Sequence, residues 1–199
     1  TLIANQIERE QLVAQLLQAN ERLAAYATTD PLTTLPNRRA LQQELALQLA
    51  RGKRQNFWVL VAFIDLDGFK SINDRHGHGA GDEFLAAIAA RLKVALRAGD
   101  LAARLGGDEF VVVGQGPGEA HLVEEARHSF QARIFEATVG SIPLEAVKIN
   151  YAGASVGVLA VEPGLHDPEQ VLNSADALMY QTKTARRFAA SKEDSVRAE

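Results

Sequence analysis

Two apolar runs separated by two glycines and two acids restrict the fold of this chain most strongly. In LAARLGGDEFVVVG, residues 101–114, the runs flank Gly106, Gly107, Asp108 and Glu109. This pattern predicts a tight β-hairpin that carries two adjacent carboxylates at its tip. Adjacent carboxylates repel each other, and the glycines leave them unshielded. Such a tip is costly unless a positive partner, such as a metal ion, lies above it.

A second apolar run, NFWVLVAFID at residues 56–65, predicts a central strand buried on both faces that ends in Asp65. If this strand lies beside the hairpin, three carboxylates converge at one end of a sheet. The chain has no cysteine, so the ligands there are hard oxygens, which favour Mg²⁺ or Mn²⁺ over Zn²⁺. Two such ions can support phosphoryl or nucleotidyl transfer. The alternative is a solvated turn with surface acids, which is common.

The remaining periodicity predicts an α/β or α+β domain behind a helical arm. Residues 2–27 have the pattern of an amphipathic helix, which either pairs with a parallel copy or folds back on its own domain. Further helices are expected at 37–50, from Phe69, at 81–96, at 118–136 and at 168–186, and further strands at 145–150 and 153–161. The expected organisation is an arm at 1–28, a folded domain at 29–188 and a polar, frayed tail at 189–199.

Composition excludes several classes of partner. The net charge is −4, so no broad basic field favours nucleic acid. No apolar run reaches the length of a membrane span. Because the first residue is Thr rather than Met, we expect the chain to be a piece of a longer protein.

The string GGDEF at 106–110, within RLGGDEF, resembles the signature loop of GGDEF-domain diguanylate cyclases, which join two GTP molecules into cyclic di-GMP. Three further stretches resemble the family in the same order: DPLTTLPNRRAL, DLDGFKSINDRHGHGAGDEFL and ADALMYQTK. The resemblance covers residues 30–187. It implies an α+β fold with a central, mostly antiparallel sheet flanked by helices, like that of nucleotidyl cyclases and polymerase palm domains.

The resemblance also implies a metal site and a reaction centre. Asp65, Asp108, Glu109 and the backbone carbonyl of Leu66 match the positions that hold Mg²⁺ or Mn²⁺. Asp108 matches the group that helps to deprotonate the attacking 3′-hydroxyl, and Glu109 supports the metals. Lys70 resembles the lysine that neutralises the triphosphate.

The substrate-binding residues implied in the same way are Phe69, Asn73, His78, Asp82, Gly106, Gly107, Lys183 and Arg187. Asn73 and Asp82 match the guanine readers. The chemistry agrees, because a carboxylate can accept from both N–H groups on guanine's Watson–Crick edge. Taken alone, His78 would be an ordinary turn residue. The two glycines let a ligand approach the backbone closely.

The C-terminal end departs from the family pattern. Lys183 and Arg187 resemble the pair that holds the β- and γ-phosphates, and their spacing of four places them on one helix face. The family has Gly before this arginine and Asn after it, whereas this chain has Arg186 and Phe188. Without that glycine the helix can run further, and Arg186 could act in place of Arg187.

The stretch RAGD, from Arg97 to Asp100, resembles the inhibitory product site of the family. Arginine can pair bidentately with phosphate or stack on a purine, and Asp can accept from guanine. The alternative is a helix end followed by a turn at Gly99 and Asp100.

The resemblance favours a Mg²⁺-dependent cyclase that works as a two-fold homodimer with one GTP in each domain. The arm then relays a signal from an upstream sensor domain missing from this chain. One alternative is a catalytically silent module that binds GTP or cyclic di-GMP, and another is a nucleotidyl cyclase with another product or purine. Because GTP is cytosolic, we expect a cytoplasmic location, including as the cytoplasmic part of a larger membrane protein.

Overall fold

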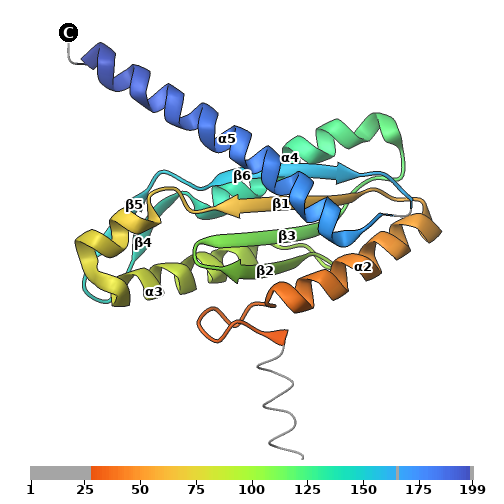
Figure 1. Ribbon diagram of the computed structural model, residues 1–199, viewed down its shortest axis with the longest axis horizontal. Helices are drawn as coiled ribbons and strands as arrows, with labels where there is room; N and C mark the ends of the chain where they lie inside the picture. The colour runs from red at the N-terminus through yellow and green to blue at the C-terminus, as the bar shows by residue number, and fades with distance from the viewer. Residues whose placement is uncertain (1–27, 165, 198–199) are drawn as a thin grey trace, which may run out of the picture.

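The computed structural model describes residues 28–164 and 166–197, with side chains described to residue 188 (Figure 1). The helix expected over residues 2–27 lies outside the described residues. The helices and strands are α2 (Arg38–Gln55), β1 (Val59–Asp65), α3 (Phe69–Ala95), β2 (Leu101–Gly106), β3 (Glu109–Gln115), η1 (Ala120–Leu122), α4 (Val123–Thr138), β4 (Gly140–Pro143), β5 (Lys148–Tyr151), β6 (Ser155–Val161) and α5 (Pro168–Arg197).

The main sheet has four strands in the order β2-β3-β1-β6, and every neighbouring pair is antiparallel. β1 occupies an interior position and all its residues are buried, which explains its uninterrupted apolar sequence. The pairing of β1 with both β3 and β6 places Asp65 opposite Glu109 and Ser155. β4 and β5 form a separate two-stranded sheet. The expected α+β class with an antiparallel sheet is confirmed.

Each face of the main sheet has its own hydrophobic core. On one face Ile64 lies in a buried cluster with Phe84 of α3 and Ile134 of α4. On the other face Val61 lies in a cluster with Leu45 of α2 and Met179 of α5. Figure 1 shows α5 crossing the sheet and continuing past it. Successive residues of a strand point to opposite faces, so β1 serves both cores.

α5 approaches β6 closely at Gly157. A Cβ atom at this glycine would lie 2.1 Å from the backbone nitrogen of Met179, so only glycine allows the helix to pack at this depth. The close packing fixes the part of α5 that leads to Lys183.

Local signals explain the start and the end of α2. The Asn37 side chain accepts hydrogen bonds from the backbone N–H groups of Arg39 and Ala40, which is the N-cap expected from the sequence. The helix ends at Gln55, and its C-cap Asn56 has a left-handed φ of 55° and an N–H that donates to the Gly52 carbonyl. It therefore extends past the end expected near residue 50.

α3 consists of two helices that meet at a glycine. A short helix from Phe69 and a second from residue 81 were expected, with a glycine-rich turn between them. The structure has one helical stretch interrupted at Gly77, where φ is 86° and ψ is 163°. These backbone angles end one helix, and a second helix begins directly after Gly77, so the two helices expected from the sequence are present with a shorter break between them.

Two other helices differ from their expected boundaries, and one strand was missed. The helix expected at 118–136 begins as the short η1 and continues as α4 to Thr138. The strand β4 was not expected at all. α5 runs to Arg197, so residue 186 is not its end and the helix extends into the tail expected to be frayed.

Candidate active site

The predicted acidic residues lie together at one end of the main sheet. Asp65 ends β1 and pairs in register with Glu109, which begins β3. Asp108 occupies the turn just before, and its backbone carbonyl accepts a hydrogen bond from Leu66 N–H at 3.2 Å. The convergence expected from the sequence is therefore present, with the loop after β1 joined to the hairpin tip.

Two of the acidic side chains at this end of the sheet have raised pKa values. Burial and the neighbouring charge of Asp65 raise the pKa of Asp108 above its ordinary value. Burial and the charge of Asp176 also raise the pKa of Glu109, while Arg38 acts in the opposite direction. Burial is the larger cause of both shifts and the neighbouring carboxylates add to it, so a cation at this end of the sheet would stabilise the charged forms.

Among residues 28–164 and 166–197, no three His, Asp or Glu side chains are grouped so that they could hold a metal ion. The oxygen donors that remain together are Asp65, Asp108 and the carbonyl of Leu66, which accepts one hydrogen bond from Phe69 N–H at 3.1 Å and keeps a second lone pair. Two carboxylates and one carbonyl fit Mg²⁺, which usually keeps several waters and shares its shell with phosphates. The participation of Glu109 stays a prediction.

A mostly buried arginine positions the hairpin tip. Arg104 donates to the carbonyl oxygen of Gly107 from Nε at 3.1 Å and from a terminal nitrogen at 2.7 Å. Its other terminal nitrogen donates to both carboxylate oxygens of Asp30, at 3.0 and 3.1 Å. Asp30 also accepts from the backbone and the hydroxyl of Thr33. The loop that precedes α2 is thus connected to the turn that carries Asp108.

This connection leads to a stability prediction for Asp30→Asn. Burial acts to raise the pKa of Asp30, but hydrogen bonds from Thr33 and the charge of Arg104 outweigh it and hold the pKa below its usual value of 3.8. The carboxylate therefore stabilises the fold above pH 4, and this stability disappears as the pH falls through the lower folded-state pKa. Losing the partner of a mostly buried arginine should lower the free energy of unfolding by about 3 kcal/mol at pH 7.

Urea unfolding at pH 7 and near pH 2 measures this effect. The difference between wild type and Asp30→Asn should shrink at the lower pH. Glu124→Gln removes a solvent-exposed partner of Arg127 and should change stability little. A difference between wild type and Asp30→Asn that is the same at both pH values would contradict the assignment.

Lys183 reaches the acidic cluster from α5. Its Nζ donates to Asp65 Oδ1 at 2.6 Å, so the lysine expected to hold phosphate lies beside a candidate metal ligand. Arg187 is exposed. Arg186 instead pairs with Asp67 at 3.4 Å and donates to the backbone carbonyl of Ala154. Because Arg186 has protein partners, Arg187 is the better candidate for reaching a phosphate.

The predicted guanine readers lie close together on α3. A Cβ atom placed on the buried Gly81 would lie 1.9 Å from Asn73 Oδ1 and 3.4 Å from the Phe69 ring. The Asn73 side chain therefore folds over Gly81, and the exposed Asp82 follows directly.

Lys70 and His78 are exposed on the same helical stretch, Lys70 in its first turn and His78 just after the break at Gly77. Their predicted contacts with the triphosphate and the substrate stay predictions.

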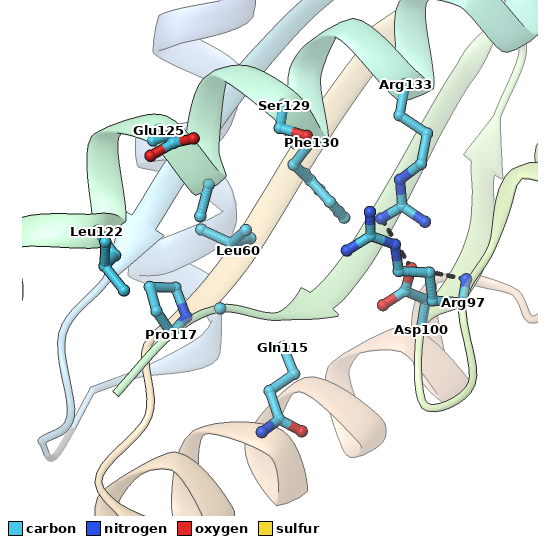
Figure 2. A pocket seen from close by; sticks show the side chains of 12 residues that line it. Leu60, Arg97, Asp100, Gln115, Pro117, Leu122, Glu125, Ser129, Phe130 and Arg133 are labelled. Atoms are coloured by element: carbon cyan, nitrogen blue, oxygen red, sulfur yellow. Dashed lines mark hydrogen bonds and ion pairs between the residues drawn. The ribbon is translucent and has the colours of Figure 1, made fainter. Parts of the chain in front are cut away.

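The predicted product site lies at a pocket away from the acids, shown in Figure 2. The pocket has a volume of about 410 Å³, and its lining includes Arg97, Asp100 and Arg133. Asp100 Oδ2 accepts from Arg97 N–H at 3.0 Å and from Arg133 at 2.9 Å. The sequence did not point to Arg133, because it is 33 residues from Asp100 and belongs to no motif.

Comparison with known proteins identifies the family. Residues 27–188 match the family described as diguanylate cyclase, GGDEF domain. The chain belongs to the GGDEF diguanylate cyclase family. It is 42% identical over 182 residues to the diguanylate cyclase DgcP of Escherichia coli (strain K12), an alignment that covers 92% of this chain and 52% of that relative. The chain therefore spans about half the length of this relative.

Solved structures of GGDEF proteins agree with the fold. A sensory box/GGDEF family protein from Caulobacter crescentus superposes with a TM-score of 0.73 at 35% identity, covering 79% of this chain and 99% of that one. The coiled coil and GGDEF domain of DgcB from the same organism, in complex with c-di-GMP, superposes with a TM-score of 0.74 at 26% identity, covering 92% and 95%. In the part of this chain that the structure describes, no helix is both long and apolar enough to cross a membrane.

Proposed function

We propose that this domain is a diguanylate cyclase that condenses two GTP molecules into 3′-5′ cyclic di-GMP and two pyrophosphates. The observation that carries the proposal is the meeting of Asp65, Asp108 and Lys183 at the same end of the sheet. Membership of the GGDEF family supports it.

Each group has a chemical task in this proposal. When bound, Mg²⁺ lowers the pKa of the attacking 3′-hydroxyl and neutralises charge on the triphosphate. Asp108, which matches the family position for this role, accepts the proton that the hydroxyl loses. Lys70, Lys183 and Arg187 supply positive charge to the phosphates as the bond to pyrophosphate breaks.

Base recognition follows from hydrogen-bond chemistry. The Asp82 carboxylate accepts from two N–H groups of guanine, and adenine offers no such pair on that edge. Asn73, held over Gly81, can both donate and accept. The pair therefore favours GTP over ATP.

The product imposes a two-fold arrangement. Cyclic di-GMP contains two equivalent 3′-5′ bonds, so each GTP supplies a nucleophile to the other. Two domains, each holding one GTP, must then face each other as a homodimer. We assign the arm at residues 1–28 to bringing two copies together under an upstream sensor, and we place the reaction in the cytoplasm, where GTP is available.

Incubation with GTP and Mg²⁺, followed by chromatographic identification of the products, tests the proposal. Cyclic di-GMP is expected from GTP and no cyclic dinucleotide from ATP. Binding of GTP without turnover would instead favour the silent module, and equal use of ATP would favour a cyclase for another purine.

Product inhibition gives a prediction for Arg97→Ala. The substitution removes a guanidinium that can pair with phosphate, but it keeps the backbone N–H that bonds Asp100, so the turn should persist. We expect added cyclic di-GMP to slow wild type and leave Arg97→Ala unaffected, with Arg97→Lys intermediate because it lacks the planar fork. Steady-state rates with added product measure this. Equal inhibition of wild type and Arg97→Ala would mean that Arg97 and Asp100 form only a helix end and a turn.

A further inference from the structure

Arg186 lies on α5 just before Arg187, and its side chain makes several contacts with the rest of the domain. Its guanidinium donates to the carbonyl oxygens of Ala154 and, at 3.3 Å, of Ala152. It also lies 5.2 Å from the centre of the Phe135 ring, a distance at which a cation is attracted to the ring face. Arg186 thus attaches α5 to the chain between β5 and β6 and to α4.

Arg186 also makes one of two ionic contacts at the end of β1, and Lys183 makes the other. Arg186 lies 3.4 Å from Asp67, and Lys183 lies 2.6 Å from Asp65. Residues three apart lie on one face of a helix, so a single orientation of α5 serves both contacts. Asp67 is further fixed by a hydrogen bond from the Ser155 hydroxyl at 2.7 Å.

Partial burial strengthens these contacts. The side chains of Arg186 and Asp67 are 32% and 28% exposed, and those of Lys183 and Asp65 are 19% and 12% exposed. Ion pairs shielded from water to this extent interact more strongly than fully exposed pairs. The contacts are therefore suited to holding α5 in one position against the end of the sheet.

We propose that Arg186 is a positioning residue for the cyclase reaction, which holds Lys183 at Asp65 by anchoring α5 and the turn after β1. The inference rests on the proposed function. Arg186 is occupied by protein groups and acts through Lys183 rather than on the nucleotide. The exposed Arg187 remains the arginine that reaches phosphate.

A double-mutant cycle on kcat/KM for GTP tests this mechanism. Arg186→Ala should lower kcat/KM by roughly tenfold, a loss of the size expected when one charged group is misplaced. Because Arg186 acts through Lys183, the double variant with Lys183→Ala should be no slower than Lys183→Ala alone. A role limited to stabilising the fold would leave the two losses independent, and they would then multiply.

Two further variants separate positioning from folding. Arg186→Lys should recover only part of the rate, because an ammonium can pair with Asp67 but cannot present the same planar set of donors. Asp67→Asn keeps an acceptor for Ser155 while removing the ion pair, so it should reproduce the loss. If Arg186→Ala does not fold, Asp67→Asn combined with Lys183→Ala completes the same cycle.

Arg127→Ala is the matched control, because Arg127 pairs with Glu124 on the exposed side of α4, and it should keep the wild-type rate. Wild-type kcat/KM in folded Arg186→Ala, or losses that multiply with Lys183→Ala, would overturn the inference. Wild-type protein that makes no cyclic di-GMP would refute the proposed function instead.

Discussion

A folded Asp108→Ala protein is expected to make no measurable cyclic di-GMP from GTP and Mg²⁺, a loss of at least roughly a thousandfold. The substitution removes a carboxylate that can hold the metal and accept the proton of the 3′-hydroxyl. It keeps the backbone carbonyl that accepts from Leu66, so the turn should keep its shape. Chromatography of the reaction mixture measures the product, and circular dichroism with thermal unfolding establishes that the variant folds.

Glu119→Ala provides the control for Asp108→Ala. Glu119 is an exposed acid in the loop that follows β3, so its removal changes the net charge by the same amount. It should retain wild-type activity. Product formation at the wild-type rate by a folded Asp108→Ala protein would remove Asp108 from the reaction centre.

Gly81→Ala is expected to raise the KM for GTP by roughly a hundredfold while leaving the fold intact. The new Cβ atom would lie 1.9 Å from Asn73 Oδ1, so this side chain must move away. The end of a flexible side chain can move at little cost to stability. The guanine edge then loses a polar partner, and in a site that recognises its substrate by hydrogen bonds this loss strongly reduces discrimination between GTP and ATP. Steady-state kinetics with GTP and ATP measure the change.

Gly79→Ala is the matched control for Gly81→Ala. A Cβ atom at Gly79 would meet no other atom within 4 Å, and the residue lies on the same helical stretch. The same substitution should therefore leave the KM for GTP nearly unchanged. An unchanged KM in Gly81→Ala would show that Asn73 does not read the base in the position that the structure gives it.

The features predicted most accurately are those that depend on neighbouring residues. The apolar run before Asp65 and the paired runs around Gly106 define a buried strand and a hairpin, because burial and turn chemistry are local properties. Asn37 begins α2 for the same reason. The sequence predicted that the acids converge on the assumption that two strands are neighbours. The register of Asp65 with Glu109 confirms that these strands are neighbours.

The features that were missed depend on contacts between distant residues. Arg104 and Asp30 are 74 residues apart, and no local pattern connects them. The short strand β4 forms because β5 offers it a partner. α5 continues past residue 186 because arginine favours a helix, and Arg186 finds partners at Asp67, Ala154 and Phe135, all distant in the sequence.

The stoichiometry of the wild-type reaction shows whether the domain condenses two GTP molecules into cyclic di-GMP. Pyrophosphate and cyclic di-GMP should be quantified in the same sample after incubation with GTP and Mg²⁺. Two pyrophosphates are expected for each cyclic di-GMP formed, and neither product is expected when Mg²⁺ is chelated. GTP that remains intact, or pyrophosphate released without a cyclic dinucleotide, would contradict the proposed reaction.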